Sequence, residues 1–348
     1  MEKKIRIAFV LKSSIYSGAE NVAISIIKGL ENRYEFLYIA TQGQIEKKLI
    51  EEKVTYHLLP KFSLNGLNKA LLNFKPDIVH AHDFTATVYC AIYQKSQKYK
   101  LISHMHYDPM WARRWNLRTL TYLILSKRVT KIIAVTRTAF SNNVFANRVK
   151  NKTIYLNNPI DIKKIRMKSE ERKDESFDIL FIGRLVEQKD PLLFINIVRE
   201  CVKYNKNIKC AMIGDGELKQ QCKNAIKELG IECELKLLGY QENPYSYIKN
   251  SRLVCMTSKW EGFGLIIAEA NILGIPVLST KNAGAMEIFG EQAIEICDKP
   301  EIMVNKISNI LKNENEYDNY KKRAEARINS FISIEQYICN INKVYQEE

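Results

Sequence analysis

The stretch Lys259-Trp-Glu-Gly-Phe-Gly-Leu-Ile-Ile-Ala-Glu-Ala270 decides the fold, and within it Glu261 and Glu269 stand eight positions apart. A strand-like run, residues 253–256, precedes this stretch. A helix-compatible run, residues 265–273, overlaps its end and is closed by a glycine and a proline. The loop between the two runs therefore joins the carboxyl end of a strand to the start of a helix. In an open parallel sheet, ligands bind at that place.

The residues of this loop suit a phosphate group that carries sugars. Gly262 and Gly264 let backbone amides approach a ligand closely, and the start of a helix favours an anion. Glu269 lies a little over two helical turns beyond Glu261, so both carboxylates project from roughly the same side. We therefore expect a nucleotide-sugar, with its diphosphate on the amides and hydroxyls of two different sugars on the carboxylates. The alternative is a simple turn with two solvated acids.

A second strand and loop supplies two cations. The strand-like run 177–182 is followed by Arg184 and Lys189, and Asp190-Pro191 has the residue types of a helix start. Two cations at the carboxyl end of a strand are well suited to bind a diphosphate.

Two more runs, 210–217 and 235–239, are predicted strands that end in glycine turns. In chain order the motifs are Gly-Arg-Leu-x3-Lys, Ile-Gly-Asp-Gly, Leu-Gly-Tyr and Glu-Gly-Phe-Gly-x4-Glu. Together they resemble the C-terminal half of family-4 retaining glycosyltransferases, and the resemblance extends over essentially the whole chain. It implies the α/β GT-B fold, in which two Rossmann-like parallel-sheet domains face each other across a cleft.

The resemblance also implies roles for individual residues. Glu261 would contact donor-sugar hydroxyls, Glu269 the ribose, and His106 a donor-sugar hydroxyl or the acceptor. Neither glutamate resembles the nucleophile of a double-displacement glycosidase. The predicted catalytic residues are His106, Glu261, Arg184 and Lys189, and the predicted donor-binding residues are Gly18, Arg184, Lys189, Gly239, Gly262, Phe263, Gly264, Leu265 and Glu269.

The implied reaction is the retaining, metal-independent transfer of a hexose or N-acetylhexosamine from a nucleotide diphosphate sugar, with UDP favoured over GDP. The nucleotide-sugar is a substrate, so no cofactor is expected. The acceptor would be a glycan, best a lipid-linked one, in capsule or exopolysaccharide synthesis. A nucleotide-sugar 2-epimerase on the same fold is the main alternative, and it would need no acceptor.

Strand-like runs, among them residues 78–81 and 293–296, alternate with helical ones along the chain, which predicts parallel sheets covered by helices on both faces. Residues 1–160 are predicted to form the acceptor-side domain and residues 177–330 the nucleotide-sugar domain. The polar segment 161–176 is predicted to be the linker between them. In the resembled family the last helix, here within 331–348, packs back on the first domain.

The acceptor-side half carries fewer motifs. Residues 14–20 follow the first strand and open a helix, where Gly18 would let the backbone approach the donor diphosphate. The family usually has a second glycine where this chain has Ser17. Two other positions depart from the family: Gly284 lacks its usual paired glycine, and Pro159 stands where glycine is common.

Four of the five histidines end two predicted strands, as the pairs His80–His82 and His104–His106. Residues two apart on a strand point to one face, and such pairs can ligate zinc. No cysteine lies near them in the sequence and the resembled family needs no metal, so we predict no metal site. His106 matches the family's active-site histidine, with His104 as the alternative register, and His80 and His82 are expected to pack in the core or on the surface.

The formal net charge of +14 belongs to one half of the chain. Residues 1–170 carry 29 Lys and Arg against 12 Asp and Glu, a net +17, whereas residues 171–348 carry 24 against 27, a net −3. This asymmetry indicates an anionic partner for the first half. A platform of interleaved surface aromatics is missing, so nucleic acid is not the expected partner.

An anionic membrane surface is the remaining candidate, and it would place a cytoplasmic protein at the inner face of the cell membrane. The segment 110–128 combines tryptophans, arginines and an apolar run, as interfacial helices do. The alternative, which we favour for the helix itself, is that Leu120, Leu123 and Ile124 face the sheet. No apolar run reaches the ~18 residues of a membrane span, and the N-terminus is expected to be a first strand and not a signal peptide.

Overall fold

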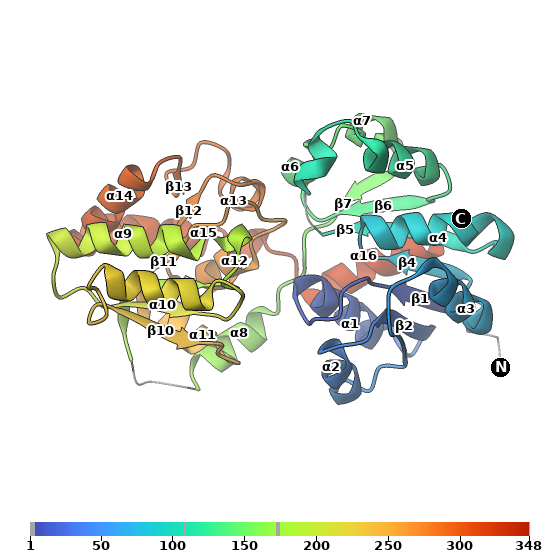
Figure 1. Cartoon of the computed structure of the whole chain (residues 1–348), viewed down its shortest axis with the longest axis horizontal. Coiled ribbons are helices and arrows are strands. Elements are labelled where there is room, and N and C mark those ends of the chain that lie inside the picture. The colour runs from blue at the N-terminus through green and yellow to red at the C-terminus, as the bar shows by residue number, and fades with distance from the viewer. Residues whose placement is uncertain (1–3, 107–108, 172–174, 348) are drawn as a thin grey trace. The chain divides into compact units, whose positions relative to one another are not determined.

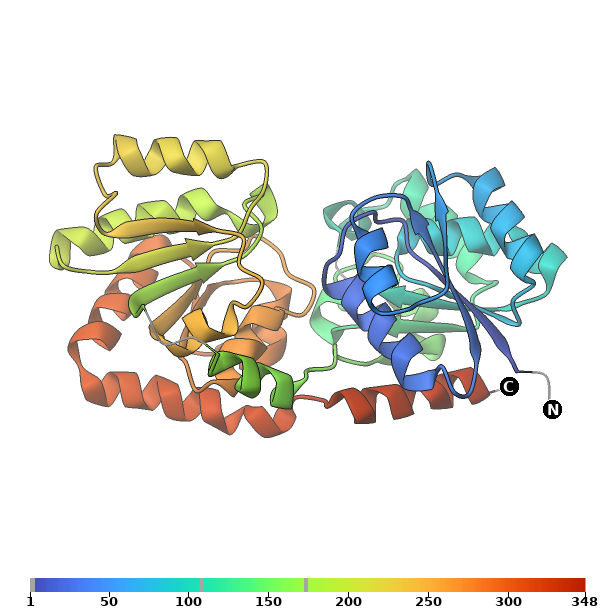
Figure 2. The same cartoon turned by 90° about the horizontal axis from the view of Figure 1, so that it is seen from below.

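The computed structural model describes residues 4–106, 109–171 and 175–347. The chain divides into two units, one of residues 1–159 with 332–348 and one of residues 160–331. Each unit contains one sheet of parallel strands with helices on both of its faces (Figure 1, Figure 2). The predicted α/β class with two Rossmann-like sheets is confirmed.

The first unit has a seven-stranded sheet in the order β3-β2-β1-β4-β5-β6-β7. Its strands are β1 (Arg6–Val10), β2 (Glu35–Thr41), β3 (Tyr56–Leu59), β4 (Ile78–Ala81), β5 (Lys100–Met105), β6 (Lys131–Ala134) and β7 (Thr153–Tyr155). Its helices are α1 (Gly18–Leu30), α2 (Ile45–Glu51), α3 (Leu64–Phe74), α4 (Phe84–Gln97), η1 (Met110–Arg113), α5 (Leu117–Ser126), α6 (Arg137–Ser141), α7 (Ala146–Val149), η2 (Lys150–Lys152) and α16 (Ile334–Gln346).

The central strand β1 is buried on both faces, because successive strand residues point to opposite sides. Ala8 and Val10 pack in the core that α3, α4 and α5 cover, and Ile7 and Phe9 pack in the core under α1, α2 and α16. The C-terminal helix α16 is thus part of the first unit, where it contacts α1.

The second unit has a six-stranded sheet in the order β10-β9-β8-β11-β12-β13. Its strands are β8 (Phe177–Ile182), β9 (Cys210–Ile213), β10 (Leu235–Gly239), β11 (Ser251–Met256), β12 (Val277–Thr280) and β13 (Ile296–Cys297). Its helices are α8 (Ile162–Ser169), η3 (Glu187–Lys189), α9 (Pro191–Tyr204), α10 (Lys219–Glu228), α11 (Tyr245–Lys249), α12 (Leu265–Ile272), α13 (Ala283–Phe289), α14 (Pro300–Lys312), α15 (Glu314–Ala326) and η4 (Ile328–Ser330).

Two apolar cores enclose this second sheet. Phe194 of α9 and Ile307 of α14 pack on one face, and Ile248 of α11, Ile267 of α12 and Phe289 of α13 pack on the other. The helices α12 and α13 therefore have fixed positions over β11 and β12, which is what positions the site described below.

The predicted linker 161–176 is wrong for most of its length. Asp161 caps α8 by accepting a hydrogen bond from the backbone amide of Lys164 at 2.9 Å, and Ile165 is buried. The helix contacts α11 and α12 and belongs to the second unit. Its lysines and arginines suggested a linker because only a narrow stripe of this short helix is buried. Residues 172–174 of the segment lie outside the described residues.

The predicted orientation of α5 is wrong for two of its three residues. Leu120 and Ile124 are 46% and 64% exposed, whereas Thr119, Tyr122 and Ser126 are buried. The buried stripe of α5 is centred on Tyr122, whose ring packs against aromatic neighbours of the core. Leu123, the third residue expected to face the sheet, is partly buried and packs against this core, whereas Leu120 and Ile124 lie on the surface.

Candidate functional site

The loop after β8 is held in place by the loop after β9. The backbone amide of Gly183 donates to the carbonyl oxygen of Ile213 at 3.0 Å. A Cβ atom added to Gly214 would lie 1.8 Å from the carbonyl oxygen of Gly183, and one added to Gly216 would lie 2.5 Å from that of Leu185. The two glycines of the Ile-Gly-Asp-Gly motif are therefore required by the close approach of two backbones.

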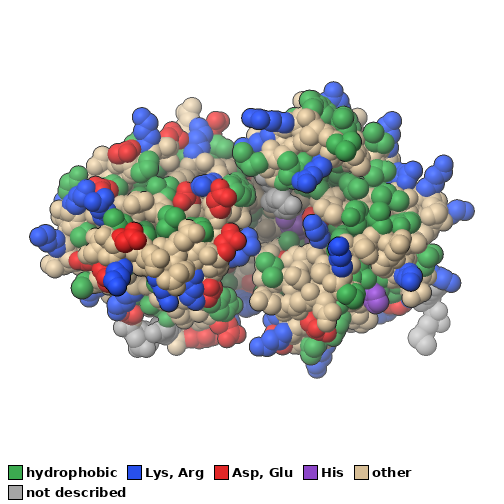
Figure 3. Space-filling view, in the orientation of Figure 1, with side chains coloured by type: hydrophobic (Ala, Val, Ile, Leu, Met, Phe, Trp, Pro, Cys, Tyr) green, Lys and Arg blue, Asp and Glu red, His purple; other side chains and the backbone are tan. Residues whose placement is uncertain are grey.

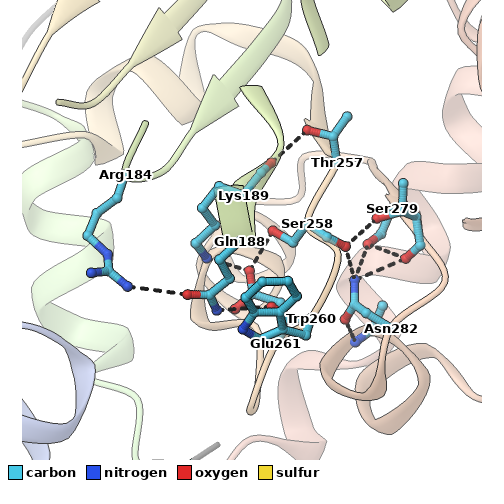
Figure 4. A network of polar contacts seen from close by, with 11 residues as sticks. Arg184, Gln188, Lys189, Thr257, Ser258, Trp260, Glu261, Ser279 and Asn282 are labelled. Atoms are coloured by element: carbon cyan, nitrogen blue, oxygen red, sulfur yellow. Dashed lines mark hydrogen bonds and ion pairs between the residues drawn. The ribbon is translucent and has the colours of Figure 1, made fainter. Parts of the chain in front are cut away.

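Lys189 and Glu261, 72 positions apart, form an ion pair in the second unit (Figure 4). The Lys189 ammonium donates to Glu261 Oε1, and the hydroxyl of Ser258 donates to the same oxygen at 2.6 Å. The Glu261 residue is only 7% exposed, so its charge is balanced by Lys189 away from bulk water. Two predicted site residues, one from each loop, are thus in direct contact.

Gln188 connects these two loops and was missed by sequence reasoning. Its side-chain amide donates to the carbonyl oxygen of Trp260 at 3.0 Å, and its backbone oxygen accepts from the Lys259 amide at 2.8 Å. Arg184, which is exposed, donates to Gln188 Oε1 at 3.3 Å. The residue occupies a variable position of the Gly-Arg-Leu-x3-Lys motif, so no pattern marked it.

The start of α12 lies beside this ion pair and has no side-chain cap. Gly264 occupies the cap position with φ 81°, a left-handed conformation that favours glycine. The first-turn amides of a helix have no acceptor within the helix, so the amides of Leu265 and its neighbours are suited to bind an anion. Phe263 is 4% exposed and anchors the loop in the protein.

Gly284 lies in α13, and its lack of a side chain lets this loop pack directly against that helix. A Cβ atom on Gly284 would lie 2.8 Å from Glu261 Cβ and 3.0 Å from the carbonyl oxygen of Phe263. The single glycine retained from the family's pair is thus the one that the packing requires.

Glu269 lies on α12, the helix that follows the Glu261 loop. Burial raises the pKa of its carboxyl to about 7, although a hydrogen bond from Tyr245 and the nearby charge of Lys189 both lower it. The Tyr245 hydroxyl donates to Glu269 Oε1 at 3.4 Å. Gly239, at the end of β10 with φ 71°, accepts a hydrogen bond from the Gly214 amide at 2.8 Å.

Gly18 and His106 belong to the first unit and are described with it. Gly18 is the first residue of α1, whose start is already occupied by Glu20: this buried carboxylate accepts from the Ser17 amide at 3.0 Å. A bound phosphate would meet that negative charge, so the role of Gly18 stays a prediction.

His106 follows β5, and its Nε2 lies 2.9 Å from Nδ1 of His82. Burial lowers the pKa of His106 to about 3, so its imidazole is neutral at pH 7. Within the described part of the chain, His106 Nδ1 is buried and has no hydrogen-bond partner. His80 and His82 are buried in the core, one of the two environments expected for them.

Two protein-family models match successive parts of the chain. The model for Glycosyltransferase Family 4 matches residues 16–164, and the model for Glycosyl transferases group 1 matches residues 162–327. The chain belongs to glycosyltransferase family 4.

Individual proteins resemble this glycosyltransferase over most of their length. An uncharacterised glycosyltransferase of Methanocaldococcus jannaschii is 29% identical over 308 residues, which cover 79% of this chain and 76% of that protein. The GalNAc-alpha-(1->4)-GalNAc-alpha-(1->3)-diNAcBac-PP-undecaprenol alpha-1,4-N-acetyl-D-galactosaminyltransferase of Campylobacter jejuni is 23% identical over 353 residues, 94% of each chain. The crystal structure of Anabaena HepE in complex with UDP and glucose matches with a TM-score of 0.84 and 20% identity, over 99% of this chain and 100% of that one, and shows the same fold, GT-B.

In the glycosyltransferase, the second unit brings together most of the predicted site residues. Arg184, Lys189, Glu261 and the loop 262–265 lie at the carboxyl ends of β8 and β11, and Glu269 follows on α12. The arrangement offers two cations and the amides at the start of α12 to an anion, and two carboxylates to hydroxyl groups. This is the chemistry that a nucleotide-sugar requires.

Proposed function

We propose that this glycosyltransferase transfers a hexose or N-acetylhexosamine from a UDP-sugar to a lipid-linked glycan, with retention of the anomeric configuration. The observation that carries the proposal is the Lys189–Glu261 ion pair beside the uncapped start of α12. The loop after β11 then supplies amides for the diphosphate and a carboxylate for a hydroxyl of the sugar, and the loop after β8 supplies an ammonium group.

Stabilisation of the leaving diphosphate is the main catalytic contribution in this proposal. A lysine ammonium has three N–H donors. Among the described residues, Lys189 donates to Glu261, so further donors are available for phosphate oxygens. Arg184 supplies a second cation once its hydrogen bond to Gln188 Oε1 is broken. Fixed charges of this kind usually account for the largest share of such a rate enhancement, and we assign no metal ion to this step.

Retention is proposed to proceed without a covalent enzyme intermediate. Glu261 Oε1 accepts from both Lys189 and Ser258, which makes it a weak nucleophile. The acceptor oxygen would bond to the anomeric carbon on the face from which the diphosphate leaves. The bond between that carbon and the phosphate oxygen breaks, and the acceptor proton passes to the departing diphosphate.

Two relatives support the choice of substrates. HepE, which shares the fold, has been crystallised with UDP and glucose, and the Campylobacter jejuni relative is named for an undecaprenol-linked acceptor. The transfer of both properties to this chain is part of the proposal, as is its role in polysaccharide synthesis.

A lipid-linked acceptor would bring the basic first unit to an anionic membrane surface, and α5 is the segment we propose for that contact. Leu117 and Ile124 are 80% and 64% exposed, and Trp115 and Arg118 are exposed beside them. Figure 3 shows apolar side chains interspersed with Lys and Arg on the face of the first unit that carries α4 and α5. Among the described residues, no helix has the length and apolar character needed to cross a bilayer.

Vesicle co-sedimentation tests this contact. The protein is expected to sediment with anionic vesicles and not with neutral ones, and Leu117→Ser with Ile124→Ser should weaken that binding. Ile50→Ser, a change of an equally exposed isoleucine on α2, is the matched control. Equal sedimentation with both kinds of vesicle, or with neither, would contradict the proposal.

Nucleotide release from a panel of UDP-, GDP- and ADP-sugars, with and without membrane extract, tests the reaction. Release from one UDP-sugar, increased by the extract and lost in Glu261→Gln, is expected. Conversion of the donor to another sugar without an acceptor and without net release of nucleotide would identify a 2-epimerase instead. Analysis of the product's anomeric configuration then tests retention.

A further inference from the structure

Four histidines gather on one face of the first unit's sheet. His80 is on β4, His82 follows it directly, His104 is on β5, and His106 follows that strand. Parallel pairing aligns Ala81 with Ser103, so the residues on either side of this pair face the same way. Neighbouring imidazole rings have centroid separations of 4.0 to 5.2 Å. His80 and His104 are fully buried and His82 is 3% exposed.

Three of these imidazoles each have a ring nitrogen close to a ring nitrogen of the other two. One nitrogen each of His80, His82 and His104 lies within 4.8 Å of the others. His80 Nε2 and His104 Nδ1 are 3.2 Å apart. Ligands ~2.0–2.1 Å from a zinc ion at the corners of a tetrahedron lie ~3.3 Å from one another. In the described part of the chain, His82 Nε2 is buried without a hydrogen-bond partner.

The opposite nitrogen of each of the three rings is held by a second group. His80 Nδ1 lies 2.7 Å from the Tyr345 hydroxyl, and His104 Nε2 lies 3.4 Å from the Tyr337 hydroxyl. His82 Nδ1 lies 2.9 Å from Nε2 of His106. Metal-binding histidines are oriented in this way, with one nitrogen on the metal and the other hydrogen-bonded to a neighbouring group.

We propose that His80, His82 and His104 bind one divalent transition-metal ion, through His80 Nε2, His82 Nε2 and His104 Nδ1. An all-imidazole set suits zinc, copper or nickel and does not suit magnesium or calcium, which prefer oxygen ligands. The three imidazoles leave one tetrahedral corner to a water or another outside ligand, and the site lies in the core of the first unit, whereas Arg184 and Lys189 belong to the second. This proposal replaces the expectation that the chain has no metal site.

Metal binding would fix the tautomer of His106. With Nε2 on the metal, the neutral His82 carries its proton on Nδ1, which then donates to His106 Nε2. His106 must therefore carry its own proton on Nδ1, the nitrogen that has no partner within the described residues. His106 is then a hydrogen-bond donor toward a substrate oxygen. This last step rests on the proposed function, whereas the metal site itself does not.

Cobalt(II) titration of the chelator-treated full chain tests the site without any donor or acceptor. We expect one equivalent of cobalt, the intense visible absorption of a tetrahedral site, displacement by zinc, and a higher Tm for the zinc-loaded protein. His82→Gln should weaken binding at least 100-fold. Tyr345→Phe leaves every ligand in place but removes the hydroxyl beside His80 Nδ1. It should weaken metal binding about 10-fold, because a group hydrogen-bonded to a metal ligand fixes the orientation of that ligand. His57→Gln, a change of the exposed histidine on β3, is the matched control and should bind as the wild type does.

Wild-type protein that shows no cobalt absorption and no change of Tm at tenfold excess metal would overturn the proposal. So would a loss of cobalt binding in His57→Gln as large as the loss in His82→Gln. The wild-type titration decides the matter even if His82→Gln does not fold. A chain that binds cobalt but releases no nucleotide from any sugar would leave the metal site standing and remove the proposed function.

Discussion

Replacing Gly284 with alanine should disable the donor loop although no predicted site residue is itself replaced. The new Cβ atom would lie 2.8 Å from Glu261 Cβ and 2.9 and 3.0 Å from the carbonyl carbon and oxygen of Phe263. Carbon atoms in good contact are ~3.5–4.0 Å apart, so the loop or α13 must move by about 0.5–1 Å. Two of the three close atoms are backbone, so a rotamer change cannot relieve the overlap.

The magnitude follows from this overlap. Extra methyl groups in a well-packed region reduce the free energy of unfolding by about 1–3 kcal/mol, and we expect Gly284→Ala to fall in that range. A displacement of about 1 Å in a positioning loop lowers turnover on the order of 100-fold. Nucleotide affinity should fall as well, because the same loop presents the amides at the start of α12.

Urea unfolding, calorimetric titration with UDP and nucleotide release measure these three effects. Gly29→Ala is the matched control, because its Cβ would meet the flexible end of the Ile338 side chain in the first unit. It is expected to retain nucleotide affinity and turnover. A Gly284→Ala protein with wild-type stability, affinity and turnover would refute the argument that this contact positions the loop.

Three further predictions concern charged groups. Burial raises the pKa of Glu269 to about 7 from 4.5, so the folded protein retains a proton that the unfolded chain releases, and the free energy of unfolding falls as the pH rises from 4.5 to 7. Glu269→Gln should remove this fall and be about 1–3 kcal/mol more stable than the wild type at pH 8 but not at pH 4, by thermal unfolding. Burial alone would raise the pKa of Glu295, but hydrogen bonds from Arg323 and Arg327 bring this pKa below its usual value. The stability that Glu295 provides is therefore present above pH 4.5 and is lost as the pH falls through the pKa of the folded protein. Glu295→Gln should therefore lower the free energy of unfolding by about 2 kcal/mol at pH 7, a difference that urea titrations should find shrinking at pH 3. Finally, the double change of Arg184 and Lys189 to alanine should reduce kcat on the order of 100–1,000-fold, and turnover within a few-fold of the wild type would contradict their role on the diphosphate.

Sequence reasoning located the sheet strands because the inner strands of a parallel sheet are continuous apolar runs. Ile78–Ala81 is both the predicted and the observed extent of β4. The prediction was less accurate at the sheet edge, where a strand predicted over 293–296 is the two-residue β13, Ile296–Cys297. Edge strands pair on one side only, so their length depends on one neighbouring strand. Their residues are also less completely buried, so the apolar pattern in the sequence is weak.

Two errors have a common physical cause. The predicted linker contains α8, and Leu120 and Ile124 of α5 are exposed where they were expected to face the sheet. Both helices bury a narrow stripe, and residue type alone does not determine which stripe that is. Packing against the rest of the unit makes the choice, through Ile165 in α8 and Tyr122 in α5.

The sequence by itself determined what depends on neighbours along the chain. Asp190 and Pro191 start α9, Gly264 starts α12, and the spacing of Glu261 and Glu269 across one loop and helix start is a local property. Such features involve residues within a few positions of one another, so their order and chemistry can be recognised in the sequence.

Only the tertiary structure decided which distant residues meet. It brought Lys189 to Glu261, placed Gly284 against the loop, and brought nitrogens of three histidines from two neighbouring segments within 4.8 Å of one another. These contacts are set by strand order, by the register between strands and by helix packing. Each of these depends on the whole unit at once, and a single sequence does not record it.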